Sequence, residues 1–396
     1  MELQRNKNLD KNLDLTKIFK DFLRIGCEYQ LKISGHWIFG SEFRWNIRSI
    51  ITWIDAIAFL CIGLTNIWTL RQDMKSVCYC LVTYGYGITG SLLWFNIRRH
   101  RDIFKDIFDT ICRFGETLER DPDENDEEIR LYLKYGKLCK TIGIGIVLFW
   151  VISGVILVLY PVFVYFYNGS VVLPFELLIP GLSSTQNPGY FITLCYQYLQ
   201  LVIAVPGYSA HLNLFFLYVM MACFQIDLMS IKLTKLNEAL VKSTEIDEKI
   251  IKITKLYQDL MIYIGKLEKL FKTQTFVDFV IYTFASVMTL YVIVKFDNYW
   301  IIGYALEATI IFMLFIPSLF GTMIEVMNNR LVVRIYQVSW YLLKPRERKS
   351  FRFLLEYAQN GTMLSCGGYF PLNLVLFQST FNRIYSYLMF LMDTSE

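Results

Sequence analysis

The sequence has little charge and few of the residues from which catalytic and metal sites are built. Charged residues make up 19% of the 396 residues, and only three residues are histidines. These histidines (His36, His100 and His211) are scattered, so no single motif offers a histidine metal cluster, and no P-loop, HExxH or GxSxG pattern occurs. We therefore expect no enzyme, no catalytic residues, no metal or cofactor site and no nucleic acid partner.

The cysteines also lack a disulfide or metal-binding pattern. There are nine of them, an odd number, and no two have a CxxC spacing. We interpret those inside or beside apolar runs as small buried hydrophobic residues. They are Cys61, Cys78, Cys80, Cys195 and Cys223.

Apolar residues are abundant, and they occur in long runs. Hydrophobic residues make up 55% of the chain, and its mean hydropathy is +0.38. Seven runs are each long enough to cross about 30 Å of hydrocarbon as a helix that rises about 1.5 Å per residue. The sequence therefore predicts an all-α membrane protein with seven transmembrane helices. The runs lie at approximately 50–70, 76–97, 141–166, 189–224, 276–296, 299–325 and 369–392.

The basic residues gather on one side of these predicted helices. Residues 1–48, 98–140, 225–275 and 326–368 carry 9, 10, 9 and 7 Lys and Arg residues, which is 35 of the 39 in the chain. The positive-inside rule places these regions in the cytoplasm. We therefore expect a cytoplasmic N-terminus and, after seven crossings, an extracellular C-terminus. A G-protein-coupled receptor is disfavoured because its N-terminus lies outside.

Two N-glycosylation sequons fall on opposite sides of the predicted membrane. Asn168-Gly169-Ser170 lies in the third connection, which carries no Lys or Arg and is expected outside, where an oligosaccharide can be attached. Asn360-Gly361-Thr362 lies on the predicted cytoplasmic side, and we expect it to be unused.

The predicted cytoplasmic connection between the fourth and fifth spans carries two helical apolar repeats. Apolar residues recur from Met229 to Leu240 at spacings of four, three and four, and a matching repeat runs from Ile253 to Phe271. We expect two long helices that extend the fourth and fifth spans into a cytoplasmic anchor region. Their apolar stripes either pack together within one chain or form a surface shared between subunits.

The C-terminal part carries the most specific pattern. In the stretch "IYQVSWYLLKPRERKSFRFLLEYAQNGTMLSCGGYFPLNLVLFQSTFNRIYSYLMFLM", Tyr336 and Trp340 stand four apart, before Pro345 and a basic segment. After a spacer follow Gly368, Phe370, Leu372, Leu374 and Phe377, and then the triplet Tyr385-Ser386-Tyr387. This stretch resembles the C-terminal third of an insect odorant receptor. Residues 213–233 resemble the family more weakly, with Asn213 where it often has Asp.

The resemblance implies a ligand-gated, non-selective cation channel that responds to a small volatile odorant. In that family a tuning subunit assembles with a common co-receptor subunit, Orco, into a heterotetramer in the plasma membrane of sensory neuron dendrites. This chain lacks Orco's long cytoplasmic insertion and its tail sequence, so the resemblance implies a tuning subunit. We divide it into a cytoplasmic tail (1–48), six transmembrane helices with the odorant pocket and helical extensions (49–325), and an anchor helix with the pore-lining last helix (326–396).

Two other functions remain open. An insect gustatory receptor would share the topology and work as a homomeric channel, but the TYhxxxxxQF-type ending usual in that family is absent here. A secondary transporter tends to contain paired repeats with broken helices, and we find no internal repeat.

The resemblance implies an odorant pocket in the outer half of the membrane, among the second, third, fourth and sixth spans. The second and sixth spans run inward and the third runs outward, which decides which of their residues lie in that half. The resulting candidates for ligand binding are Val82, Thr83, Tyr86, Ser153, Ile156, Leu157, Tyr160, Tyr198, Val202, Tyr304, Glu307 and Ala308.

Glu307 has two interpretations, because an acid inside a membrane segment is costly and needs a proton, a partner or water. It either forms a hydrogen bond to a neighbouring helix or anchors a polar group of the odorant. The second interpretation rests on Tyr304, which stands three residues before Glu307 on the same helical face.

The last predicted helix carries a candidate pore stripe. Arg383, Tyr387, Phe390 and Thr394 recur at spacings of four, three and four, and Asp393 borders them near the outer end. If the stripe faces a central axis, Phe390 is placed for a hydrophobic constriction and Asp393 for an acidic mouth that favours cations. The resemblance agrees, since the family's gate lies shortly after its Tyr-Ser-Tyr triplet. Alternatively, Phe390 packs between subunits and Asp393 is a solvated helix end.

Overall fold

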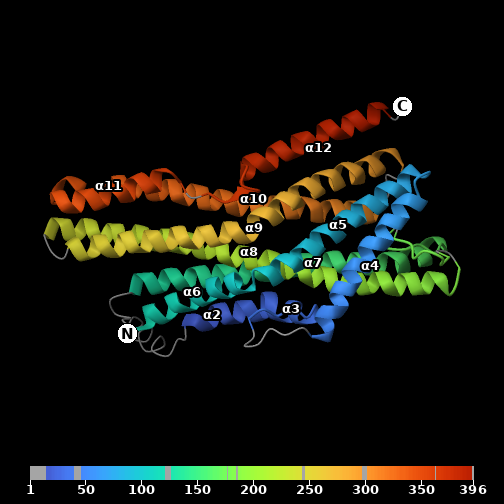
Figure 1. The fold of residues 1–396 in the computed structure, drawn as a ribbon, viewed down its shortest axis with the longest axis horizontal. Helices are drawn as coiled ribbons and strands as arrows, with labels where there is room; N and C mark the ends of the chain where they lie inside the picture. The colour runs from blue at the N-terminus through green and yellow to red at the C-terminus, as the bar shows by residue number, and fades with distance from the viewer. Residues whose placement is uncertain are drawn as a thin grey trace.

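The chain folds into an elongated bundle of helices, which is shown by a computed structural model (Figure 1). The structure describes residues 15–39, 46–120, 126–175, 177–183, 186–242, 246–296, 301–361 and 363–394. The helices are α2 (Leu15–Leu23), the π-helical η1 (Arg24–Glu28), α3 (Tyr29–Ile33), α4 (Ile47–Thr69), α5 (Met74–Arg99), α6 (Arg101–Arg120), α7 (Asp126–Asn168), α8 (Gly189–Lys242), α9 (Ile246–Lys295), α10 (Ile301–Tyr336), the 3-10 turn η2 (Trp340–Leu342), α11 (Pro345–Gln359) and α12 (Leu374–Thr394). Two short strands, β1 (Ser365–Cys366) and β2 (Phe370–Pro371), form an antiparallel hairpin before α12.

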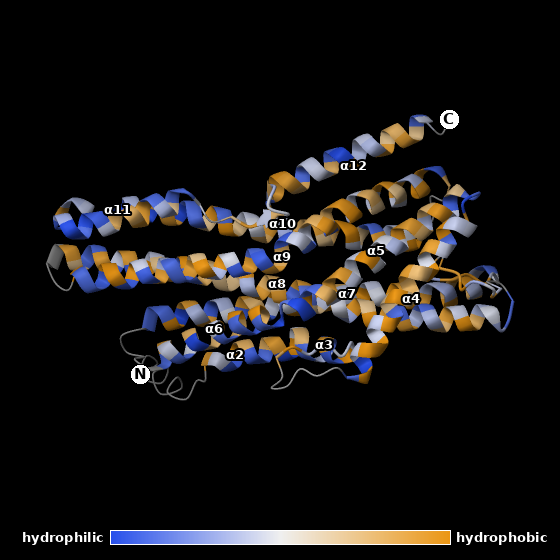
Figure 2. Ribbon diagram, in the orientation of Figure 1, coloured by the Kyte–Doolittle hydropathy of each residue, from blue (hydrophilic) through white to orange (hydrophobic). Residues whose placement is uncertain are grey.

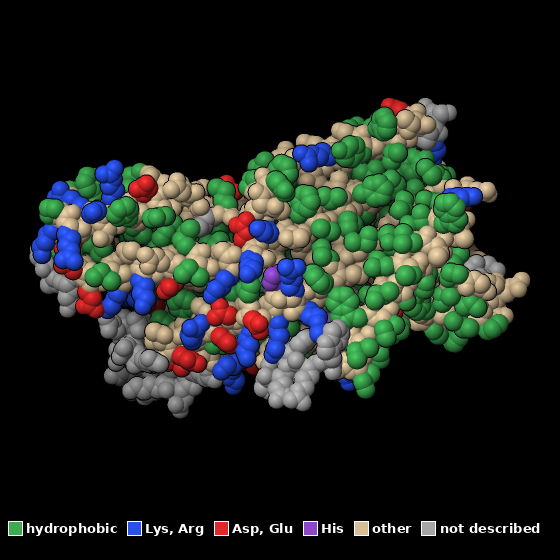
Figure 3. Space-filling view, in the orientation of Figure 1, with side chains coloured by type: hydrophobic (Ala, Val, Ile, Leu, Met, Phe, Trp, Pro, Cys, Tyr) green, Lys and Arg blue, Asp and Glu red, His purple; other side chains and the backbone are tan. Residues whose placement is uncertain are grey.

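The two ends of the molecule differ in chemistry. Hydrophobic side chains cover the end that contains α4, α12, the C-terminal halves of α7 and α9 and the N-terminal halves of α8 and α10 (Figures 1 and 3). The ribbon at this end is coloured mostly as hydrophobic (Figure 2). Lys, Arg, Asp and Glu side chains gather over the opposite end, which contains α2, α6, α11 and the tips of α8 and α9 (Figure 3). We call these the apolar end and the charged end. Such a division fits a protein whose apolar end lies in a lipid bilayer.

The predicted all-α membrane fold is confirmed. Among the described residues, α4, α7, α8, α9 and α10 are long and apolar enough to cross a membrane. The second and last predicted spans correspond to α5 and α12, which also reach into the apolar end (Figure 1). Polar residues within α5 and α12 lower their hydropathy. Seven helices therefore occupy the predicted positions, while the side on which each terminus lies stays a prediction.

The N-terminal segment is more than a tail, because its helices pack against α6, α7 and α8. Phe19 and Phe22 of α2 and Leu31 of α3 are all buried. The Phe19 ring contacts that of Tyr132 in α7 edge-on, with 4.9 Å between their centroids. Apolar residues three and four apart place these side chains on one helix face, and the charged residues around them occupy the other.

The long helix α8 forms the core of the molecule. Every residue from Gly207 to Ile226 is buried, as expected for a helix that is apolar all round and surrounded by other helices. Farther along, Leu233 of α8 and Leu260 of α9 are also buried within this single chain. The apolar stripes of the two predicted extensions therefore pack against elements of their own chain, which is the first of the two alternatives.

The start of α12 is fixed by the β-hairpin and by α10. Gly367 has a positive φ of 69° and donates a backbone hydrogen bond of 2.9 Å to the Lys272 carbonyl in α9. A Cβ atom at Gly321 of α10 would lie 1.8 Å from the Leu372 carbonyl oxygen, so only glycine allows this approach. The Leu374 amide donates to the Thr322 hydroxyl at 2.8 Å. Because the hairpin occupies 365–371, the last helix begins after residue 369, where its span was predicted to start.

Beyond this fixed start, α12 stands away from the rest of the chain (Figure 1). It contacts α9 and α10, but only Thr380 and Ile384 are buried among its residues. Tyr385, Tyr387 and Phe390 are 55–65% exposed. The outer part of this helix therefore makes few contacts within its own chain.

Candidate ligand-binding site

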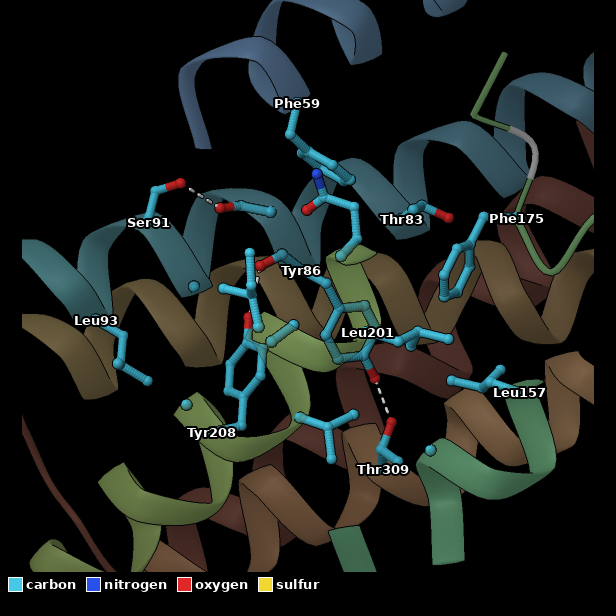
Figure 4. Close-up of a pocket in the computed structure, with 18 of the residues that line it drawn as sticks. Phe59, Thr83, Tyr86, Ser91, Leu93, Leu157, Phe175, Leu201, Tyr208 and Thr309 are labelled. Carbon is cyan, nitrogen blue, oxygen red and sulfur yellow. Dashed lines mark hydrogen bonds between the residues drawn. The ribbon is translucent and has the colours of Figure 1, made fainter. Parts of the chain in front are cut away.

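A cavity lies inside the apolar end, where α4, α5, α7, α8 and α10 meet (Figure 4). Its free volume is about 130 Å³. An apolar cavity of about 150 Å³ binds benzene, so this slightly smaller cavity is close to the size of a small aromatic molecule. Most of the wall is apolar or aromatic. The larger apolar side chains are Phe59, Leu93, Trp94, Trp150, Leu157, Phe175, Leu201, Ile203 and Val205.

The hydroxyl groups of two tyrosines form hydrogen bonds that join the helices of the cavity wall. The Tyr86 hydroxyl of α5 lies 2.5 Å from the Thr309 hydroxyl of α10, as the dashed line in Figure 4 marks. The Tyr208 hydroxyl of α8 donates to the Tyr86 carbonyl at 2.5 Å and lies 2.6 Å from the Thr89 hydroxyl. These groups satisfy each other, so a ligand would bind mainly by shape and buried apolar area, at about 25 cal/mol per Å².

One wall carries a carboxyl group that the sequence analysis did not select. Asp55 of α4 lines the cavity and is 8% exposed, and the Gln200 amide of α8 donates a hydrogen bond to it at 2.6 Å. The sequence did contain a signal for this pair, because Asp55 and Gln200 are polar residues inside apolar runs. Asp55 was not a candidate because the resemblance implies a pocket among the second, third, fourth and sixth spans, and Asp55 lies in the first. Among the described residues, no group of His, Cys, Asp or Glu is placed to hold a metal ion.

Close helix contacts at two glycines shape the cavity. A Cβ atom at Gly87 of α5 would lie 2.1 Å from the Phe59 ring, and one at Gly207 of α8 would lie 2.4 Å from the Trp94 ring. Both rings line the cavity. The absence of a side chain at these positions therefore lets the two rings reach the places that they occupy.

The structure brings four of the twelve predicted pocket residues together in the cavity wall, namely Thr83, Tyr86, Ser153 and Leu157. Their contact with a ligand stays a prediction. The remaining candidates do not line this cavity. Val82 is buried, Tyr160 and Tyr198 are half-buried, and Ile156, Val202, Tyr304 and Ala308 are exposed on the outer surface.

Helix rotation accounts for the difference between these candidates and the residues that line the cavity. Leu201 lines the cavity where Val202 was predicted, and Ala305 does so where Tyr304 was predicted. One residue along an α-helix turns the side chain by about 100°, which is enough to exchange the inner face for the outer one. Tyr198 instead joins two helices, since its hydroxyl donates to the Val158 carbonyl at 2.9 Å.

Glu307 also lies outside the cavity wall. It is 8% exposed, and the Ser286 hydroxyl of α9 donates a hydrogen bond of 2.6 Å to its carboxyl group. This geometry matches the interpretation of Glu307 as a residue that bonds a neighbouring helix. The adjacent Leu306 does line the cavity, so Glu307 sits directly behind the wall.

A chain of hydrogen bonds leads from the cavity to α9. The Thr89 hydroxyl, bonded to Tyr208, lies 3.1 Å from the Tyr282 hydroxyl of α9. The Gln274 amide of α9 donates to the Thr89 carbonyl at 3.3 Å and to the Asp278 carboxyl at 2.9 Å. Because α9 packs against α12, this chain connects the cavity wall to the helix that supports α12.

The predicted pore stripe lies on the poorly packed part of α12. Arg383, Tyr387 and Phe390 border a groove of about 500 Å³ between α12 and α9. Asp393 and Thr394 are exposed at the end of the helix. The described part of one chain thus places all five residues along an open face rather than around a closed channel.

Comparison with known proteins places this architecture in a family. The family model described as 7tm Odorant receptor matches residues 69–385. Odorant receptor 10 of Aedes albopictus is 23% identical over 341 residues, which cover 83% of this chain and 86% of that protein. Putative odorant receptor 83c of Drosophila melanogaster is 23% identical over 250 residues, covering 59% of this chain and 63% of that one.

Solved structures show the same fold. The insect olfactory receptor OR5 from Machilis hrabei in complex with eugenol superimposes with a TM-score of 0.78, covering 96% of this chain and all of that one at 14% identity. The structure of the same receptor described without eugenol gives a TM-score of 0.75. The relatives are receptors and not enzymes. This chain therefore belongs to the insect odorant receptor family.

Proposed function

We propose that this chain is the odorant-binding tuning subunit of a ligand-gated, non-selective cation channel that it forms with Orco subunits. The observation that carries the proposal is the cavity in the apolar end, because hydrogen bonds connect its wall to α9, on which α12 packs. A site for a small apolar molecule is thereby linked to the helix that we assign to the pore.

The ligand of this cavity is a small volatile organic molecule. Thr83, Tyr86, Ser153 and Leu157 contribute both hydroxyl and apolar surface to the wall. The Machilis receptor of the same fold binds eugenol, a small and largely apolar molecule, which supports the same class of ligand here. Such a site discriminates weakly, since one methylene in a hydrophobic pocket is worth only about 1–3 kcal/mol.

The odorant opens the channel because it binds more tightly to one of two arrangements of the helices than to the other. A ligand in the cavity contacts Tyr86 and Tyr208, whose hydrogen bonds run to Thr89 and from there to Tyr282. A shift of these groups changes how α9 lies against α12. An odorant that binds one arrangement more tightly therefore moves α12 without contacting it.

Assembly into a tetramer is supported by an exposed apolar surface at the charged end. Large hydrophobic side chains around η2 and α11 are about half exposed in a region that lipid does not cover. A patch of this kind marks a contact with another protein. We assign it to subunit assembly, and its members are Trp340, Tyr341, Leu342, Phe353 and Tyr357.

The last helices of four subunits, α12 of this chain and its counterparts in Orco, then line the pore. We assign the constriction to Phe390 and the acidic mouth to Asp393, with Thr394 beside it and with Arg383 and Tyr387 toward the inner vestibule. The open face of α12 supports this arrangement, because another subunit can approach it. Asp393→Lys should lower divalent permeability by placing a cation at the mouth, and Phe390→Ala should raise the current without odorant.

The charged end lies in the cytoplasm in this proposal, with the N-terminus inside and the C-terminus outside. Asn168, which is exposed at the end of α7, then lies outside and is available for glycosylation. The site of action is the plasma membrane, in the dendrite of a sensory neuron.

The test is electrophysiological. Cells that express this chain alone, Orco alone or both are exposed to a panel of small odorants that includes eugenol. We expect odorant-evoked cation current only when both are present, with potency that changes when Thr83 or Leu157 is replaced. Robust odorant-evoked current from this chain alone would support a homomeric gustatory-type channel instead, and coupled uptake without current would support a transporter.

A further inference from the structure

A second hollow lies on the outside of the molecule, where the apolar end meets the charged end. It has a volume of about 700 Å³ and lies between the last turn of α5 and the middle of α9. Asn96 of α5 holds the two helices together here by donating to the Leu270 carbonyl at 2.7 Å. The hollow shares no lining residue with the odorant cavity. Its polar lining residues are Asn96, Arg99, His100, Glu268, Lys269, Lys272, Thr273 and Gln274.

The charge in this hollow is positive and is poorly compensated. Arg99, Lys269 and Lys272 are exposed, and among the described residues none of the three forms an ion pair with an acid. By contrast, Lys266, one turn away, pairs with Asp106 at 2.5 Å.

The lining also contains one acid, Glu268, and one histidine, His100, beside the three cationic side chains. The Glu268 carboxyl accepts a hydrogen bond from the Ser365 hydroxyl at 2.5 Å. Burial lowers the pKa of His100, and the positive charges of Arg99 and Lys269 lower it further. A multiply charged anion would relieve this repulsion and accept hydrogen bonds from the same groups.

Apolar side chains on the membrane side of the hollow distinguish a lipid from a free anion. Phe95 lines the hollow, is 47% exposed and has the Arg99 guanidinium 5.9 Å from its ring centre. Leu92 of α5 also lines the hollow and is half-buried. A lipid headgroup in the hollow would therefore have its acyl chains beside apolar surface, which is the depth at which basic residues contact headgroups.

We propose that this hollow binds the headgroup of a phospholipid that carries phosphate monoesters. Arg99 forms paired hydrogen bonds to one phosphate, and Lys269 and Lys272 supply point charges to another. In the orientation proposed above, this lipid belongs to the inner leaflet.

The bound lipid would also act on the pore helix. The Lys272 carbonyl accepts the hydrogen bond from Gly367 in the hairpin before α12, and Gln274 bonds the Thr89 carbonyl in the chain that leads from the odorant cavity. A lipid that holds this part of α9 therefore stabilises one position of α9 relative to α12. The binding itself is measurable without any channel current, so it stands or falls separately from the proposed function.

The experiment is native mass spectrometry of the purified full-length chain. The protein receives phosphatidylinositol 4,5-bisphosphate, phosphatidylserine or phosphatidylcholine in separate samples, and soluble inositol 1,4,5-trisphosphate in a fourth. We expect the bisphosphate lipid to be retained best. Replacing Arg99, Lys269 and Lys272 together by Gln should lower its affinity by on the order of a hundredfold, since each basic residue contributes about a factor of five.

A matched variant with Lys249, Lys255 and Lys349 replaced by Gln removes the same charge far from the hollow and should bind as the unmodified chain does. Equal retention by the two triple variants would overturn the proposal, and so would retention of phosphatidylcholine equal to that of the bisphosphate lipid. Binding of inositol 1,4,5-trisphosphate alone would identify a soluble anion and exclude the lipid. If the triple Gln variant does not fold, Lys272→Glu alone, at an exposed position, must show the loss.

Discussion

The helices α8 and α12 both reach into the apolar end, yet their surroundings are opposite. Every residue of α8 from Gly207 to Ile226 is buried, whereas Thr380 and Ile384 are the only buried residues of α12. A helix enclosed by its own chain can move only if the whole bundle rearranges. A helix held mainly at its start can move with little cost to the fold. The comparison assigns stability to α8 and agrees with the proposal that α12 moves in gating.

The largest expected effect is on stability, and it separates the two helices directly. Phe216 of α8 is fully buried, and its ring lies 4.8 Å from that of Phe320. Phe216→Ala should lower the free energy of unfolding by about 3–5 kcal/mol, because it leaves a cavity in the core. Phe390→Ala on α12, where the ring is 65% exposed, should change it by less than about 0.5 kcal/mol.

The measurement is the midpoint of thermal unfolding of each purified variant in detergent. Similar losses in both variants would contradict the comparison, because they would show that α12 packs as tightly as α8.

A pH effect of similar size on stability is expected in the N-terminal segment, which packs against α8. The His36 ring is fully buried, stacks on that of Trp94 at 4.6 Å and has its Nδ1 2.8 Å from the Ser34 carbonyl oxygen. Burial lowers the pKa of His36 to about 4. In the unfolded chain the pKa is about 6.5, so the unfolded state binds the proton first as the pH falls.

Stability should therefore be fully present above about pH 6.5 and fall by roughly 3 kcal/mol as the pH falls to about 4. Denaturant titrations of the unmodified chain and of His36→Asn between these pH values check this expectation. The variant should be less stable throughout but should lose the part of the pH slope that His36 contributes. Identical slopes would assign the effect to other groups.

A smaller effect is expected in the odorant cavity, on the face of α5 that meets α4. Gly87→Ala would push the Phe59 ring, since the new Cβ atom would lie 2.1 Å from it. The ring moves into or away from the cavity, so odorant potency should change by on the order of tenfold, the effect of about one methylene in an apolar pocket. Dose–response curves in complexes with Orco measure it.

Gly145→Ala in α7 is the matched control, because a Cβ atom there meets nothing within 4 Å. Unchanged curves in both variants would remove Phe59 from the ligand site. Equal changes in both would point to a general effect of alanine on the helices.

The smallest effect is expected in the connection between the cavity and α9. Tyr282→Phe removes the hydroxyl that lies 3.1 Å from that of Thr89, at a cost of about 1 kcal/mol. Tyr282 does not line the cavity, so odorant binding should change little while the maximal odorant-evoked current falls several-fold. Tyr263→Phe removes a comparable hydrogen bond, to the Tyr218 carbonyl at 2.9 Å, outside this connection. A normal maximal current in Tyr282→Phe would remove the hydroxyl from the gating pathway.

The sequence predicted those features that depend on long repeats. Seven apolar runs gave the seven helices, and the spacing from Met229 to Leu240 gave the extension of α8, because both patterns persist over several turns. It did not predict the helical N-terminal layer, whose short apolar spacing is interrupted by charges. It also missed the hairpin at 365–371, because two residues per strand leave no periodicity to detect.

Only part of the cavity wall was predicted, and the reason is geometric. Thr83, Tyr86, Ser153 and Leu157 line it, but Val202 and Tyr304 lie one residue away from Leu201 and Ala305, which do. Membrane helices that are apolar on all sides give no sign of which face points inward. That face is set by contacts such as the one between Gly207 and Trp94, which join segments far apart in the sequence.

The central claim, that the exposed face of α12 lines the pore, is tested most directly by cysteine accessibility. Phe390→Cys and Asp393→Cys are each expressed with Orco, and a cationic methanethiosulfonate reagent is applied outside during odorant-evoked current. The account predicts irreversible loss of current in both variants. It predicts no loss in the unmodified chain, in which Cys61 and Cys195 are exposed and not buried as the sequence analysis expected. It also predicts no loss in Phe163→Cys on the outer surface of α7. Undiminished current in both α12 variants would contradict it.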